Sequence, residues 1–145
     1  MRPSLDRRKS LPFYPAAMRL YLVRHAEAAP GTPDELRTLT PEGREQARQL
    51  GERLRGEGVV ADAVLCSPLL RAGETADALG LGRTEPDERL APGATADGVR
   101  AAIAGRGETV VVVGHQPDCG RIASALTGGP EPKFRPAGVA EIDLP

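Results

Sequence analysis

The run Thr109-Val-Val-Val-Val113 constrains the fold more than any other part of this sequence. A strand with one face in water alternates polar and apolar residues, whereas these four valines are apolar on both faces. Such a run is typical of a central strand in a parallel sheet, where helices cover both sides. It therefore predicts a buried strand with helices packed above and below it.

The rest of the chain alternates short apolar runs with segments of helical spacing. Thr40-Pro41 and Ser67-Pro68 each pair an N-cap hydroxyl with a proline at the first helical position, where its missing N–H costs nothing. Strands are expected over 19–24, 63–66, 84–90 and 139–144, and helices over 41–56, 68–80, 95–105 and 118–128. This order predicts an α/β fold, a three-layer α/β/α sandwich with a mostly parallel central sheet.

The length of 145 residues suits a single domain. The 17 glycines and 14 prolines raise the alternative of a disordered chain, but the net charge of -1 and the blocks of apolar residues argue against it. Residues 1–17 are basic and interrupted by prolines, so we expect a flexible leader there, followed by one domain over 18–145. Met18 is an alternative start.

Composition excludes several classes of function. A chain with a balanced charge and 3% aromatic residues lacks the basic field and the stacking rings of a single-strand nucleic-acid binder. No apolar run approaches the roughly 18 residues of a membrane span, and the prolines in 10–15 do not suit a signal peptide. We expect a cytoplasmic monomer in which Cys66 and Cys119 are free thiols.

Both histidines of the chain follow predicted strands. Arg24-His25 ends the first strand, and Gly114-His115 ends the valine strand. The strand over 63–66 ends in Cys66-Ser67, with Arg71 about one turn into the next helix. Ligands of open α/β sheets bind outside the carboxyl ends of the strands, so these side chains are expected at one shared edge.

The residue types at this edge point to a phosphate. Guanidinium groups donate in a fork that matches phosphate oxygens, and helix N-termini after the strands add N–H groups. With Arg24, Arg71 and His115 on the anion, His25 becomes a candidate nucleophile, because imidazole with a reference pKa of about 6.5 is largely neutral at pH 7. Its other ring nitrogen needs an acceptor, for which a backbone carbonyl suffices.

Four ordered blocks carry a resemblance to a known family. Leu22-Val-Arg-His-Ala-Glu-Ala28 resembles the signature of the histidine phosphatase superfamily, which has a phosphoglycerate mutase-like fold. The match runs from about Arg19 to Leu144, and Leu90-Ala-Pro-Gly93 is most similar to the small SixA-type phosphohistidine phosphatases. The later blocks are Leu39-Thr-Pro-Glu-Gly43 with Gln46-Ala47, Ser67-Pro-Leu-Leu-Arg-Ala72 with Glu74-Thr-Ala76, and Val112-Val-Gly-His-Gln-Pro117.

The resemblance implies a phosphatase without cofactor or metal. His25 would accept the phosphoryl group and water would hydrolyse the resulting phosphohistidine, while Arg24, Arg71 and His115 hold the oxygens. SixA-like proteins also carry an arginine at the place of Arg37, which is either a further phosphate or substrate contact or a solvated loop charge. Gln116, in the last block, is a further candidate for binding substrate.

The segment after the third strand departs from the family. Many members have a carboxylate there that protonates the leaving oxygen, but here the stretch reads Arg89-Leu-Ala-Pro-Gly-Ala94. A phosphohistidine that is protonated on its remote nitrogen releases neutral imidazole without such an acid, so we expect a protein phosphohistidine substrate. The loops between the four blocks are short, so we also expect a shallow, open pocket. Asp87 or Glu88 could still act as the acid, and a solvated turn is the alternative for both.

Four other functions stay open. One is a broad phosphomonoesterase for small molecules, and another is a non-catalytic phosphohistidine-binding module. Cys66 and Arg71 echo a cysteine-phosphatase loop, although four residues separate them where that loop has five. A metal site built from His25, His115, Glu27 and Asp118 is weakly suggested, because these residues lack a short ligand spacing.

Overall fold

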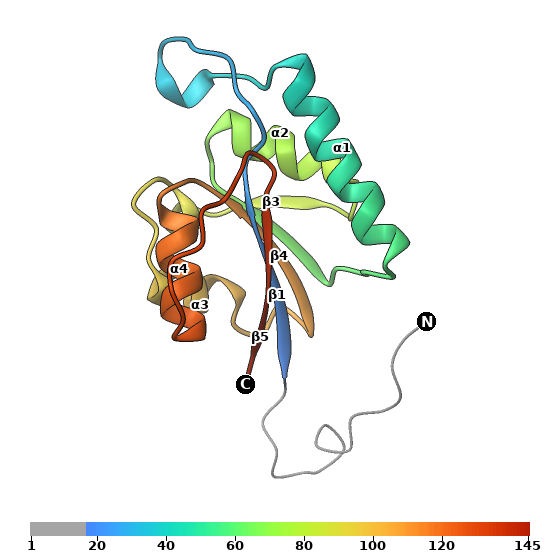
Figure 1. Cartoon of the computed structure of the whole chain (residues 1–145), viewed down its shortest axis with the longest axis vertical. Coiled ribbons are helices and arrows are strands. Elements are labelled where there is room, and N and C mark those ends of the chain that lie inside the picture. Colours follow the sequence, from blue (N-terminus) through green and yellow to red (C-terminus); the bar gives the residue numbers. More distant parts are fainter. Residues whose placement is uncertain (1–16) are drawn as a thin grey trace.

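The computed structural model describes residues 17–145 (Figure 1). The predicted leader, apart from its last residue, lies outside the described residues. Five strands form one sheet in the order β3-β2-β4-β1-β5. They are β1 (Met18–Arg24), β2 (Ala63–Cys66), β3 (Thr84–Pro86), β4 (Thr109–Gly114) and β5 (Val139–Leu144). The helices are α1 (Pro41–Gly56), α2 (Leu70–Leu79), α3 (Ala96–Ile103) and α4 (Asp118–Thr127), with short 3₁₀ helices η2 (Asp34–Leu36) and η3 (Glu88–Leu90).

The valine strand β4 lies at the centre of the sheet, as predicted. It pairs in parallel with both β1 and β2, and only β5 runs antiparallel, against β1. Val110 and Val112 pack with residues of α3 and α4, whereas Val111 and Val113 pack with residues of α1 and α2. Each of these valines is exposed by 1% or less. The three-layer sandwich with a mostly parallel sheet is therefore confirmed (Figure 1).

Helix α1 begins as the sequence predicts, but α2 does not. The Thr40 hydroxyl accepts the N–H of Gly43 and caps α1, with Pro41 in its first turn. Ser67, predicted to cap α2, is buried, and its hydroxyl instead meets Nε2 of His115. Helix α2 consequently begins two residues later than expected, at Leu70.

Strand β3 is also shorter than predicted, because it ends at Pro86. The carboxylate of Asp87 accepts the N–H of Arg89 and turns the chain into the 3₁₀ helix η3. The remaining expected elements are present, and their ends differ from the expected ones by two residues at most. Helix α2 ends at Gly80, whose φ of 63° is left-handed, a conformation that glycine adopts without strain.

Helices α1 and α2 pack closely at Gly51. An added Cβ there would lie 2.0 Å from the carbonyl oxygen of Leu79, so the alanine variant must push the two helices apart. Overpacking costs about 1–3 kcal/mol, more than the gain of about 1 kcal/mol that alanine brings to a helix. We expect Gly51→Ala to lower the midpoint of thermal unfolding.

The matched control is Gly56→Ala at the end of α1, where an added Cβ meets nothing within 4 Å. This variant should be as stable as the parent protein or more stable. Equal unfolding midpoints for the two variants would contradict the close packing at Gly51.

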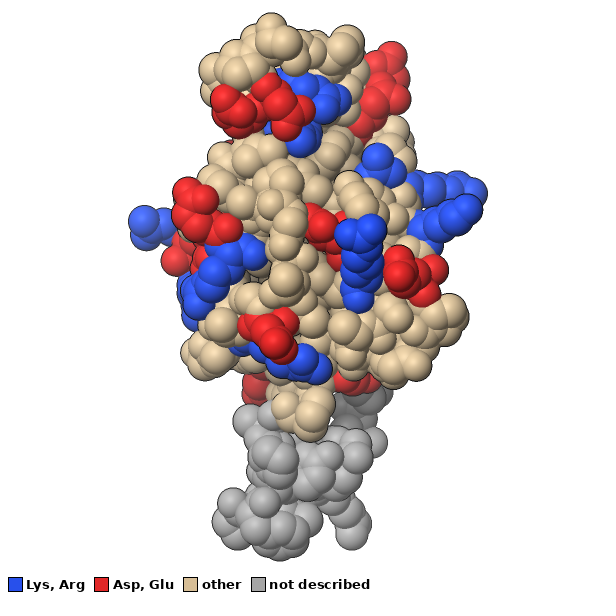
Figure 2. All heavy atoms as spheres, turned by 90° about the vertical axis from the view of Figure 1, so that its left-hand side faces the viewer, with Lys and Arg blue, Asp and Glu red and all other residues tan. Residues whose placement is uncertain are grey.

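The face shown in Figure 2 has no large patch of side chains that all carry the same charge. Lysine and arginine side chains alternate over that face with aspartate and glutamate. Among residues 17–145, no helix has the length and apolar character required to cross a bilayer.

Candidate active site

The two histidines meet at the carboxyl edge of the sheet. His25 follows β1 and His115 follows β4, and these two strands are parallel neighbours. The N–H of His25 donates to the carbonyl of Gly114, and the ring centroids of the two histidines lie 5.3 Å apart in an edge-to-face arrangement. The juxtaposition predicted from the sequence is present in the structure.

The ring of His25 has a defined tautomer. Its Nδ1 lies 2.7 Å from the carbonyl oxygen of Ala26, and since a carbonyl can only accept, Nδ1 carries the proton. Nε2 therefore keeps its lone pair. Burial lowers the pKa of His25 below its ordinary value, and the positive charges of Arg71, Arg24 and Arg37 lower it further. At neutral pH the ring is an uncharged nucleophile or base.

His115 is more deeply buried and is held by Ser67. Its Nε2 lies 2.7 Å from the Ser67 hydroxyl, and the oxygen of that hydroxyl accepts the N–H of Leu69. Burial lowers the pKa of His115 to about 4, and His25 and Arg71 add to the effect. His115 is thus neutral at pH 7 and can donate one hydrogen bond.

Two arginines reach this edge with part of their donors in use. Nη1 of Arg24 donates to the carbonyl of Phe134 over 2.8 Å. Arg71 donates from Nη1 to the backbone carbonyl of Asp34 and from Nη2 to its carboxylate, 2.9 and 3.2 Å away. The Arg71 side chain is 8% exposed, whereas that of Asp34 is 59% exposed. Asp34 therefore lies at the mouth of the site and Arg71 inside it.

Three buried side-chain nitrogens within residues 17–145 have no hydrogen-bond partner. They are Nε of Arg24, Nε of Arg71 and Nδ1 of His115. Buried nitrogens are normally satisfied, so three of them on residues grouped around His25 indicate a place for an acceptor-rich ligand. An oxyanion supplies such acceptors and also balances the two guanidinium charges.

Arg37 lies at the mouth of the site, whereas the Gln116 side chain binds the first turn of α4. Arg37 donates from Nε to the carbonyl of Ala29 and from Nη1 to Asp34, and its charge acts on His25. It lies at the same mouth as Asp34. The side-chain oxygen of Gln116 accepts the N–H of Gly120 in the first turn of α4. Its contact with substrate stays a prediction.

Sequence reasoning missed Asp34 and the role of Ser67. Asp34 forms an ion pair with Arg37, and their spacing of three residues is the local signal that could have indicated this pair. The arginines Arg37 and Arg71 hold the pKa of Asp34 below its usual range, so this carboxylate is ionised at neutral pH. It can accept a hydrogen bond at the mouth of the site but has no proton to donate.

The carboxylates considered for other roles have protein partners. Asp87 accepts from the guanidinium and the backbone N–H of Arg89, which lowers its pKa, so it too is ionised. Asp118 accepts the N–H of Gly93, and Glu27 accepts the hydroxyl of Thr40.

Cys66 is buried, and burial raises the pKa of its thiol to about 11, which leaves it protonated at neutral pH.

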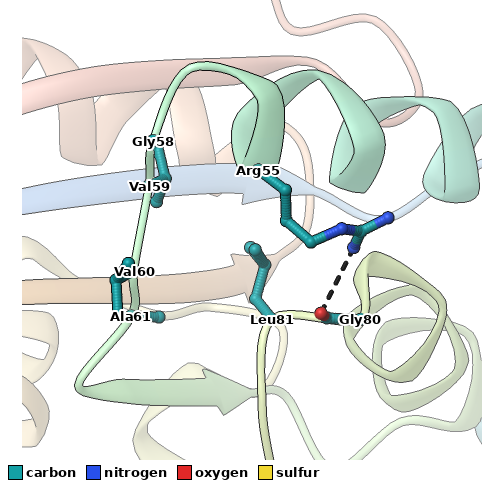
Figure 3. A pocket seen from close by; sticks show the side chains of 7 residues that line it. All are labelled: Arg55, Gly58, Val59, Val60, Ala61, Gly80 and Leu81. Atoms are coloured by element: carbon teal, nitrogen blue, oxygen red, sulfur yellow. Dashed lines mark hydrogen bonds between the residues drawn. The ribbon is translucent and has the colours of Figure 1, made fainter. Parts of the chain in front are cut away.

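A second hollow lies at the opposite edge of the sheet, before β2 and β3 (Figure 3). Its volume is about 300 Å³, and its lining combines apolar side chains with Arg55. The guanidinium of Arg55 donates to the carbonyl of Gly80 over 3.2 Å and so closes the end of α2. No histidine and no carboxylate lines this hollow, so the chemistry belongs to the edge that carries His25.

Comparison with known proteins shows the family of the chain. The sequence profile of the histidine phosphatase superfamily (branch 1) matches residues 20–92. The chain is 30% identical over 138 residues to the phosphohistidine phosphatase SixA of Escherichia coli strain K12. This match covers 88% of this chain and 86% of SixA. It is 33% identical over 123 residues to an uncharacterized protein of Picosynechococcus, and this match covers 77% of this chain and 74% of the relative.

A solved structure extends the agreement to three dimensions. The protein histidine phosphatase SixA in complex with tungstate superposes with a TM-score of 0.79 at 30% identity, over 86% of each chain. The sheet and its flanking helices thus match the phosphoglycerate mutase-like fold. From its sequence and its fold, the chain belongs to the histidine phosphatase superfamily and is a phosphatase.

Proposed function

We propose that this phosphatase acts on protein phosphohistidine through a phosphoryl group carried on His25. The observation that carries the proposal is the free Nε2 of His25 together with the three unpartnered nitrogens, on Arg24, Arg71 and His115, at the same edge of the sheet. The similarity to SixA, a phosphohistidine phosphatase that was solved with a tetrahedral oxyanion, supports both the anion and the substrate class.

In the first step the lone pair of His25 Nε2 attacks phosphorus. The bond from phosphorus to the leaving group breaks, and its electron pair departs with that group. Nδ1 of His25 keeps its proton and donates it in a hydrogen bond to the Ala26 carbonyl, which helps to stabilise the positive charge that the ring gains. Arg24 and Arg71 neutralise charge on the equatorial oxygens, where the charge of a phosphoryl transition state lies, and His115 donates a hydrogen bond to them.

In the second step water attacks the phosphoryl group on His25. The bond to Nε2 breaks, its electron pair returns to the ring, and inorganic phosphate leaves with both protons of the water. Since His25 is neutral at pH 7 before and after turnover, the resting nucleophile needs no separate base to restore it.

The leaving group decides the substrate class. Asp87 and Asp34 are both held ionised by arginines, so neither offers a proton to a departing oxygen. An alkoxide is a very poor leaving group without that proton, whereas a phosphohistidine protonated on its remote nitrogen leaves as neutral imidazole. Glu88 stays the other candidate acid. Without a protonated carboxylate, the site favours cleavage of a P–N bond over cleavage of an alkyl phosphate ester.

The test compares kcat/KM for a phosphohistidine-containing protein, an aryl phosphate and an alkyl phosphate. We expect the phosphohistidine protein and the aryl phosphate to turn over much faster than the alkyl ester. An alkyl ester that reacts as fast as the phosphohistidine protein would favour the broad phosphomonoesterase. Binding of the phosphohistidine protein without steady-state release of phosphate would identify a non-catalytic module.

Acid should inactivate the enzyme only below the ordinary pKa of histidine. The pKa of His25 is lowered from 6.5, mainly by burial, and attack on phosphorus requires the neutral ring. Activity is therefore full above pH 6.5 and falls as the pH drops through the lowered pKa. The measurement is kcat/KM against pH with an aryl phosphate whose own titration is determined separately. An acidic limb at or above pH 6.5 would contradict this environment for His25.

A further inference from the structure

The peptide between Ala26 and Glu27 is bound on both of its polar atoms. Its carbonyl oxygen accepts Nδ1–H of His25 over 2.7 Å. Its N–H, that of Glu27, donates to the side-chain oxygen of Gln46 over 3.0 Å. Gln46 of α1 is thus joined to the ring of His25 through one amide plane, although its side chain does not touch the ring.

The start of α1 fixes this segment firmly. The N–H of Thr40 donates to the carbonyl of Glu27 over 3.0 Å. A Cβ added at Gly43 would lie only 2.0 Å from the same carbonyl oxygen, so the helix packs directly on the backbone of Glu27. Gln46 follows one turn later on α1, at the place from which its amide reaches the Glu27 N–H.

Helix α2 holds the preceding peptide from the other side. The N–H of Ala26 donates to the hydroxyl of Thr75 over 3.0 Å, and that hydroxyl donates to the carbonyl of Arg71 over 2.8 Å. Thr75 is completely buried. Both peptides of Ala26 are therefore tied to helices, and the carbonyl that accepts from His25 has a fixed direction.

We propose that Gln46 is a positioning residue for His25, which orients and polarises the Ala26–Glu27 peptide so that Nε2 stays aimed at the phosphoryl group. An amide whose N–H is bound is a stronger acceptor at its carbonyl, because hydrogen bonds along a chain polarise one another. This role rests on the proposed function of His25 as the phosphoryl acceptor.

The charged groups that face His25 set the background for this effect. They are Arg24 at the end of β1, Arg37 after η2 and Arg71 of α2, while His115 is neutral. All three cations lower the pKa of His25, and the bond to the Ala26 carbonyl raises it. A weaker carbonyl acceptor therefore lowers the pKa of His25 further, whereas a negative charge at position 46 raises it.

The experiment follows the His25 ring directly. The chain has two histidines, so ¹⁵N imidazole resonances of the whole protein are assigned with one His115→Asn sample and then titrated with pH. We expect Gln46→Met to shift the His25 titration to lower pH and Gln46→Glu to shift it to higher pH. With an aryl phosphate, Gln46→Met should lower kcat on the order of tenfold at an unchanged KM, because orientation of the nucleophile suffers.

The matched control is Gln49→Met, on the same face of α1, where the amide donates only to Glu45. It should leave both the titration and kcat unchanged. A His25 titration that is the same in Gln46→Met, Gln49→Met and the parent protein would overturn the positioning role. Because the titration is read without turnover, it stays interpretable even where the phosphoenzyme proposal fails.

Discussion

Replacing His25 by alanine is expected to abolish turnover and, with it, the phosphoryl group that rapid acid-free quenching traps on the enzyme. His25 has a tautomer set by the Ala26 carbonyl that leaves the lone pair of Nε2 free, whereas Nε2 of His115 lies against the Ser67 hydroxyl. Without the nucleophile, the transfer through a covalent intermediate is lost, and kcat should fall roughly 10,000-fold or more.

The trapped group has a chemical signature that identifies its carrier. Phosphohistidine is labile in acid and stable in base, so ³²P label should survive alkali and disappear in acid. Label of this kind that persists undiminished in His25→Ala, or its absence from the parent protein, would refute the mechanism.

Cys66→Ser is the control that separates the rival nucleophile. Because burial raises the pKa of the Cys66 thiol to about 11, this side chain is no thiolate at neutral pH, and its loss should leave turnover intact. Loss of activity in Cys66→Ser with retention in His25→Ala would instead establish a cysteine phosphatase.

The layers of the fold and the centre of the site were predictable because each depends on local pattern. Four valines in a row can be buried on both faces only in a covered sheet, and β4 is that strand. The carboxyl-edge rule then placed His25 and His115 together without any knowledge of distances. The predicted backbone acceptor for His25 is also present, as the carbonyl of Ala26.

The early end of β3 has a local cause, but the errors at the site concern side chains whose partners are distant in the sequence. Ser67 precedes a proline and has the local features of an N-cap, but His115, 48 residues away, takes its hydroxyl. Asp34 pairs with Arg71 across 37 residues, and only the folded chain brings the two together. Tertiary contacts of this kind override local propensity, and one sequence contains no record of them.

The second large effect is expected from Arg71→Met. Arg71 is the more enclosed of the paired residues Asp34 and Arg71, and its unpartnered Nε lies among the nitrogens assigned to the phosphoryl oxygens. Loss of one preorganised donor to a developing oxyanion costs on the order of 100- to 1,000-fold in kcat. The fold should persist, because the carboxylate of Asp34, left without this partner, is 59% exposed and stays hydrated.

The readouts are kcat and kcat/KM with a phosphohistidine protein and the inhibition constant of tungstate, which tests oxyanion binding apart from chemistry. In Arg71→Met the kinetic constants should fall and tungstate should inhibit less tightly. Arg71→Lys should restore only part of either, since an ammonium group cannot donate two parallel hydrogen bonds as a guanidinium does. The charge control is Arg44→Met, which removes an exposed partner of Glu74 and should change neither readout by more than about twofold. Equal tungstate inhibition of Arg71→Met and Arg44→Met would show that the oxyanion does not bind at Arg71. The centre of the site would then lie elsewhere. If tungstate binding weakens while kcat is retained, Arg71 binds the ground state and the transition state equally, and its catalytic contribution is refuted.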